Sequence, residues 1–139
     1  MKYIISLSLL TFFLSSAMIQ NNTVIEPQSS DYQADSGKII YETYCLACHQ
    51  EDGSGVPNMN PPLIKTDWVL GDSTRLINVI LKGLKDTEIN GDSYSNEMPA
   101  HDFLTDYQIA EVLTYVRKSF GNQASAISSE EVKKQRVKK

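Results

Sequence analysis

The 139-residue chain contains only two cysteines, and this scarcity excludes several kinds of protein. Both cysteines lie in one pentapeptide, CLACH at residues 45–49, so none is left for a disulfide elsewhere in the fold. No cysteine follows the apolar N-terminal run, which excludes a lipid anchor of the lipoprotein type. Any chemistry of the two thiols must therefore be local to the pentapeptide.

The sequence also lacks the usual signatures of an independent enzyme. It has no glycine-rich phosphate-binding loop and no recognisable pair of base and nucleophile outside the pentapeptide. The net charge is −4 and the apolar fraction is ordinary for a soluble protein. We therefore expect a protein that is not an enzyme by itself and that has no nucleic acid among its partners.

What the chain does contain is Cys-x-x-Cys-His, a pattern typical of the attachment of c-type haem. Cys45 and Cys48 are three residues apart, so on a helix both sulfurs project from the same side and suit thioether bonds to the two vinyl groups of one haem. His49 can then supply the fifth ligand to the iron. We expect one covalently attached haem c as the cofactor.

Three other interpretations fit the two cysteines less well. A zinc site that added His101 to Cys45, Cys48 and His49 would have its second ligand pair split, unlike the usual zinc spacings. A thioredoxin-type dithiol belongs beside a strand–helix–strand unit, and no buried strand precedes Cys45. A disulfide between residues three apart closes too small a loop to stabilise a long chain.

The order of polar and apolar segments divides the chain into four parts. Residues 1–17 have the pattern of a secretory signal peptide, with an uncleaved anchor as the alternative, although the apolar run is short for a bilayer span of about 20 residues. Residues 18–34 indicate a flexible linker, 35–121 the folded domain and 122–139 a disordered basic tail. We expect a protein of the periplasm, or otherwise extracytoplasmic, that is membrane-anchored if the N-terminus is not cleaved.

Apolar periodicity predicts an all-α domain of three to five short helices. The first helix is expected from a cap at Asp35 or Ser36 and carries the pentapeptide at its end. The second is expected after a cap at Asp72, and the last after Thr105, which begins a capping-box pattern. An Asn-Gly pair favours a short hairpin near residues 87–94.

The proline-rich run at residues 56–63 predicts one wall of the haem site, because its prolines cannot lie inside a helix. A metal-bound histidine needs an acceptor for its other ring nitrogen. The carbonyl of Pro61 or Pro62 is the expected acceptor for His49, and Leu63 is expected to pack on the haem edge.

Met98 is the expected sixth ligand to the iron. It precedes Pro99, which would stiffen its loop, and it lies about 50 residues beyond His49, so the chain can wrap the haem and return on its far face. Met59, His101 or an open site remain the alternatives.

These motifs together resemble class I (mitochondrial-like) c-type cytochromes, especially the small bacterial single-haem domains, over residues 35–121. Gly37 and Tyr41 fall where that family places a glycine and an aromatic on the first helix. Val112 and Tyr115 fall where it places their packing partners on the last helix. The resemblance implies the cytochrome c fold, in which the first and last helices cross beside one covalently bound haem.

The same resemblance implies site residues and a function. Pro61 and Leu63 match the proximal proline and leucine, and Met98 matches the methionine ligand. The implied function is one-electron transfer, with weak docking to redox partner proteins such as a dehydrogenase, quinol–cytochrome c reductase or terminal oxidase. A permanent cytochrome subunit of a dehydrogenase or oxidase is the alternative, followed by a haem sensor with an open sixth site. The acidic surface predicts a basic patch on the partner.

Overall fold

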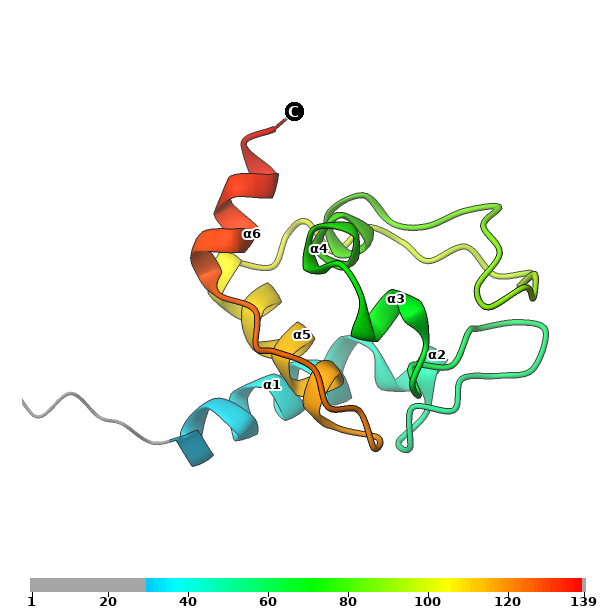
Figure 1. Cartoon of the computed structure of the whole chain (residues 1–139), viewed down its shortest axis with the longest axis horizontal. Helices are drawn as coiled ribbons and strands as arrows, with labels where there is room; N and C mark the ends of the chain where they lie inside the picture. The colour runs from blue at the N-terminus through cyan, green and yellow to red at the C-terminus, as the bar shows by residue number, and fades with distance from the viewer. Residues whose placement is uncertain (1–29, 139) are drawn as a thin grey trace, which may run out of the picture.

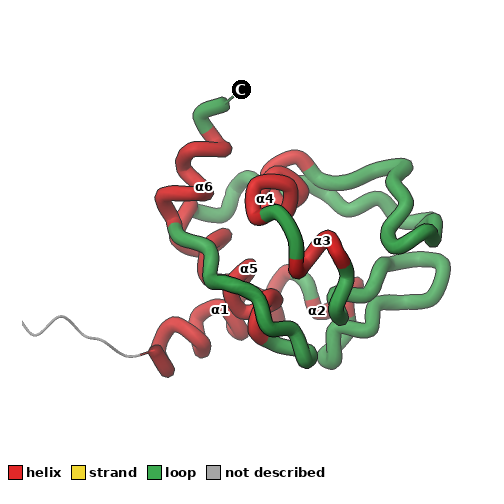
Figure 2. Tube along the Cα trace, in the orientation of Figure 1, coloured by secondary structure: helices red, strands yellow, loops and turns green. Residues whose placement is uncertain are grey.

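The computed structural model describes residues 30–138, which form short helices joined by long loops (Figures 1 and 2). Residues 30–138 contain isolated β-bridges but no β-strand. Within this range no helix combines the length and the apolar character needed to cross a bilayer. The six helices are α1 (Ser30–Tyr44), α2 (Leu46–His49), α3 (Asp67–Leu70), α4 (Ser73–Lys82), α5 (Asp106–Lys118) and α6 (Ser129–Arg136).

The crossing of α1 and α5 organises the core (Figure 1). The two helices approach closely at Gly37, where an added Cβ would collide with the carbonyl oxygen of Glu111 and lie 2.8 Å from Cβ of Tyr115. The fully buried Tyr41 ring then packs 5.5 Å from the ring of Tyr115 and 5.3 Å from that of Phe120. The predicted crossing of two helices at a glycine is therefore confirmed.

Two of the predicted helix starts are also confirmed. The Asp72 side chain accepts a hydrogen bond from the backbone N–H of Thr74 at the start of α4. Thr105 and Gln108 form the expected capping box at the start of α5. These caps satisfy backbone donors that a helix leaves open at its first turn, so α4 and α5 begin at fixed points beside the core.

The predicted hairpin near residues 87–94 is a single tight turn without strands. The backbones of Ile89 and Asp92 exchange two hydrogen bonds of 2.9 and 3.1 Å. Asn90 and Gly91 both have positive φ, 55° and 88°, as a two-residue turn of this type requires.

The first helix begins earlier than the sequence indicated. It starts at Ser30, so residues 30–34 of the predicted linker are helical, while residues 1–17 and 18–29 lie outside the described part of the chain. Ser36 is inside the helix and is not its cap. Its hydroxyl donates instead to Oε2 of Glu111 on α5, at 2.7 Å.

The prediction of a disordered tail over residues 122–139 is wrong for the described residues 122–138. Ser128 and Glu131 form a capping box that starts α6, and Val132 on this helix is completely buried. Near its end, Arg136 pairs with Asp106 at 2.6 Å and donates to the carbonyls of Asp102 and Leu104. The segment looked solvated because it is rich in charge, yet a few apolar contacts and these bonds hold it on α4 and α5.

Because the C-terminal segment is folded, substitutions of its two valines should affect the free energy of unfolding differently. Replacing the buried Val132 with Ala should lower the free energy of unfolding by about 1–3 kcal/mol, because it leaves a gap in the core. Replacing Val137, which is 74% exposed near the end of the same segment, should change it by less than about 0.5 kcal/mol. Chemical denaturation of both variants measures this, and equal effects would show that α6 does not pack on the core.

Candidate functional site

The pentapeptide lies at the junction of α1 and α2, beside a cavity. Cys45 is the residue between the two helices and is partly buried, whereas Cys48 on α2 is exposed. The backbone N–H groups of Cys48 and His49 both donate to the Cys45 carbonyl, at 3.1 and 2.9 Å. This short helical turn brings Cys45, Cys48 and His49 to the same cavity.

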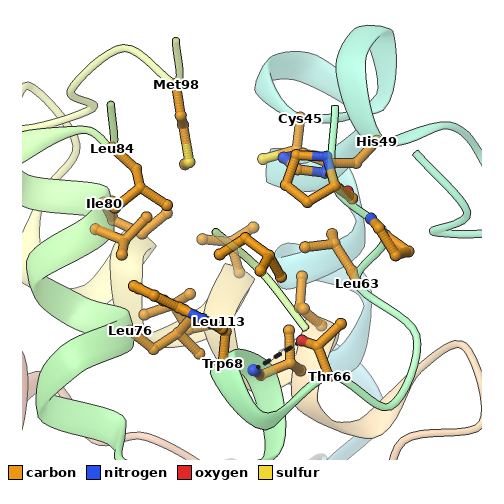
Figure 3. A pocket seen from close by; sticks show the side chains of 17 residues that line it. Cys45, His49, Leu63, Thr66, Trp68, Leu76, Ile80, Leu84, Met98 and Leu113 are labelled. Atoms are coloured by element: carbon orange, nitrogen blue, oxygen red, sulfur yellow. Dashed lines mark hydrogen bonds between the residues drawn. The ribbon is translucent and has the colours of Figure 1, made fainter. Parts of the chain in front are cut away.

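The cavity consists of two adjoining hollows. The inner hollow is almost entirely apolar and is bounded by α3, α4 and α5. The outer hollow opens beside Cys48. In Figure 3, Leu76 and Ile80 of α4 lie on one side of the space, with Leu63 and His49 across from them. Both hollows share the lining residues Cys45, His49, Pro61, Leu84, Ile89 and Met98.

The His49 ring has one defined orientation. Its Nδ1 lies 3.0 Å from the carbonyl oxygen of Pro61, which can only accept, so Nδ1 must carry the hydrogen of this bond. Burial lowers the pKa of His49, and the bond to Pro61 opposes this only in part. The imidazole is therefore neutral near pH 7, with Nε2 carrying a free electron pair suited to a metal. Of the two prolines considered, the structure selects Pro61 as the partner.

The environment of the cysteines does not suit thiol redox chemistry. Burial, followed by the nearby Cys48, raises the pKa of the Cys45 thiol to about 11. Reactive cysteines have a lowered pKa, because the thiolate is the nucleophile. Within residues 30–138 there is also no group of three or more His, Cys, Asp or Glu side chains that could hold a metal ion.

Met98 enters the cavity from the loop that follows α4, and its sulfur points into the space in Figure 3. Its backbone is fixed by two hydrogen bonds with Leu84, of 3.0 and 2.9 Å. This pairing depends on Gly83, which ends α4 with φ of 75° and where a Cβ would collide with the Met98 carbonyl. Met59, in contrast, is 45% exposed and lines neither hollow.

A group of aromatic rings lies beside the opening of the cavity. Tyr44 and His101 line the outer hollow, and Phe103 packs 5.4 Å from the Tyr44 ring and 5.7 Å from the His101 ring. Phe103 is 63% exposed and Tyr44 43% exposed. We call these three residues the aromatic patch. The Nδ1 of His101 lies 3.0 Å from the Pro99 carbonyl oxygen.

Several cavity-lining residues were not identified from the sequence. The sequence indicated packing rather than chemistry for Trp68 and Val69, and Thr66, Leu84 and Ile89 were not singled out. They lie on α3 or on loops, where no helical periodicity marks the inward face. On α4 and α5, where helical periodicity does mark an apolar face, Leu76, Ile80 and Leu113 line the cavity.

Comparison with known proteins identifies the family. The family model described as cytochrome c matches residues 34–120. The chain is 36% identical to cytochrome c-552 of Thermus thermophilus over 117 residues, which cover 77% of this chain and 88% of that protein. It is 34% identical over 108 residues to the cytochrome c subunit of the quinone alcohol dehydrogenase of Gluconobacter oxydans (strain 621H). That match covers 76% of this chain but only 23% of the subunit.

A further relative is a cbb3-type cytochrome c oxidase subunit from Rhodobacter capsulatus, 31% identical over 103 residues, which cover 34% of that subunit. The chain thus spans about a quarter to a third of these two enzyme subunits. Its residues also fit a haem: an apolar cavity, two thiols at its edge, and an imidazole and a thioether that both line it. The chain therefore belongs to the cytochrome c family, the electron-transfer proteins that carry covalently bound haem c.

Proposed function

We propose that this protein is a one-electron carrier whose haem is attached to Cys45 and Cys48, with His49 and Met98 as the two axial ligands. The observation that carries the proposal is that a neutral, oriented imidazole and a methionine side chain line the same apolar cavity. When bound, the haem supplies an iron that takes up and gives back one electron. A thioether ligand favours the ferrous form, so this ligand pair suits a carrier of relatively high potential.

The surrounding residues have three roles in this proposal. The Pro61 carbonyl holds the imidazole in one orientation, as partners of metal-binding histidines commonly do. The Leu84 backbone holds the Met98 loop, so that neither ligand needs to move when the charge changes. Leu63 and the apolar side chains of α4 and α5 exclude water, which disfavours the more highly charged oxidised state.

We propose that the redox partner docks on the aromatic patch at the cavity opening. Exposed aromatic side chains are enriched in protein interfaces, and the patch adjoins the exposed Cys48. Asp86 lines the same opening, and Asp102 is exposed next to Phe103. A partner with a basic rim around an apolar centre fits this surface.

The relatives favour two kinds of partner. Cytochrome c-552 supports a free carrier, because this chain covers most of its length. The dehydrogenase and oxidase subunits support the alternative of a cytochrome subunit in a larger complex. In either case we propose action in the periplasm or elsewhere outside the cytoplasm, on the basis of the signal-peptide pattern at residues 1–17, with membrane association if that segment is retained.

The ligand assignment predicts different effects for two methionines. Met98→Ala should lower the reduction potential by on the order of 0.1 V, well inside the span of about 0.8 V that axial ligands control. It should also abolish the weak charge-transfer band that oxidised haem shows when methionine is bound. A visible spectrum and a redox titration of the haem-loaded protein measure both.

Met59→Ala is the matched control, because Met59 is the other methionine of the described residues and lines neither hollow. It should leave the band and the potential unchanged. Loss of the band in Met59→Ala, or its survival in Met98→Ala, would overturn the assignment.

The docking proposal predicts a loss of reactivity without a change in the haem. Phe103→Ala should slow the second-order reaction with a basic redox protein about fivefold or more, the effect of truncating a substantial interface residue. Leu70→Ala, 37% exposed on α3 and outside both hollows, serves as the control and should not slow it. The wild-type rate should fall as salt is added. Stopped-flow kinetics test this, and equal rates for Phe103→Ala and the wild type would exclude the patch as the docking site.

A further inference from the structure

One wall of the cavity has little secondary structure to hold it. The segment of residues 63–71 contributes Leu63, Thr66, Trp68 and Val69 to the cavity lining. Its only regular element is the single turn of α3. The backbone of this segment must therefore be fixed by contacts from elsewhere in the chain.

Asn122 provides the first of these contacts. Its side chain is 3% exposed and uses all its polar atoms. Oδ1 accepts from the Lys65 N–H at 2.8 Å, and Nδ2 donates to the carbonyls of Leu63 and Val116, at 2.9 and 2.8 Å. Lys65 has φ of 51°, a left-handed conformation that is uncommon for lysine, and the Asn122 bonds to the Lys65 N–H and the Leu63 carbonyl help to hold it.

Arg117 provides the second contact. Arg117 is also only 3% exposed. Nη1 donates to the carbonyls of Val69 and Gly71, at 2.7 and 3.1 Å, and Nε donates to the Ser125 carbonyl at 2.8 Å. A charged donor makes such bonds stronger than neutral ones. Arg117 therefore joins the far end of the wall to the chain that follows α5.

We propose that Asn122 and Arg117 are positioning residues for the haem, which they influence by fixing the wall at residues 63–71. Leu63 follows two residues after Pro61, whose carbonyl orients His49, so the Asn122 bond to Leu63 also limits movement of that carbonyl. Asn122 lies beyond residue 120, where the match to the family model ends. The C-terminal segment of this chain thus helps to set the redox properties of the site. The inference rests on the proposed function, because it concerns the surroundings of the proposed ligand His49.

The test compares Asn122→Ala with Thr114→Val in the full-length, haem-loaded protein. Thr114 on α5 makes two hydrogen bonds to Ile127, of 3.2 and 2.9 Å, and neither bond involves residues 63–71. Thr114→Val therefore loosens the same C-terminal segment without touching residues 63–71. The two readouts are hydrogen exchange at the Lys65 amide and the reduction potential, both measured well below the unfolding transition.

For Asn122→Ala we expect exchange at Lys65 to be about tenfold faster, the factor that corresponds to one lost hydrogen bond. We also expect a lower reduction potential, because a looser wall admits water beside the site. Thr114→Val should leave both unchanged. Equal shifts in the two variants, or no shift in Asn122→Ala, would overturn the proposal.

Arg117→Lys is a second variant in case Asn122→Ala does not fold. Lysine keeps the charge but cannot reach Val69, Gly71 and Ser125 together, so the potential should again fall. An unchanged potential in this variant would count against the proposal. The exchange measurement does not depend on which residues bind the iron. Failure of the proposed ligand pair would appear in the wild-type spectrum, whereas failure of this inference would appear only in the comparison of variants.

Discussion

The hydrogen bond from Nδ1 of His49 to the Pro61 carbonyl is the interaction on which the site depends most directly. It joins the end of the pentapeptide to the proline-rich loop, so these two segments hold one another in place. It also decides which ring nitrogen is free to bind a metal. Met98, the proposed second ligand to the iron, lines the same apolar cavity.

The cavity is built from parts of the chain that are far apart in sequence. α4 and α5 supply apolar side chains. The other walls are loops, and a few hydrogen bonds hold each of them in place. Leu84 fixes Met98, and the buried side chains Arg117 and Asn122 fix the wall at residues 63–71. Buried polar groups are costly unless they are fully bonded, and these two side chains are bonded to backbone groups that have few other partners.

The sequence was most informative where function and local geometry coincide. The pentapeptide and the caps at Asp72 and Thr105 each have a physical reason that acts over a few residues. The helix crossing at Gly37 is a long-range contact and was expected only from the resemblance to the family. The C-terminal helix was missed because Val132 and Ile127 are too sparse to give a periodic pattern, although Ser128 and Glu131 carried a capping-box signal. The roles of Arg117 and Asn122 could not be predicted, since their partners in residues 63–71 lie 46 to 59 residues away in sequence.

The central claim is that one haem is joined to Cys45 and Cys48, and the intact mass of the denatured chain tests it most directly. The protein should be produced in a host able to export it and attach haem, then unfolded in acid and treated with an alkylating reagent. We expect the mass of the chain to be increased by one haem, with neither cysteine alkylated. A chain without added haem, with both cysteines alkylated, would contradict it.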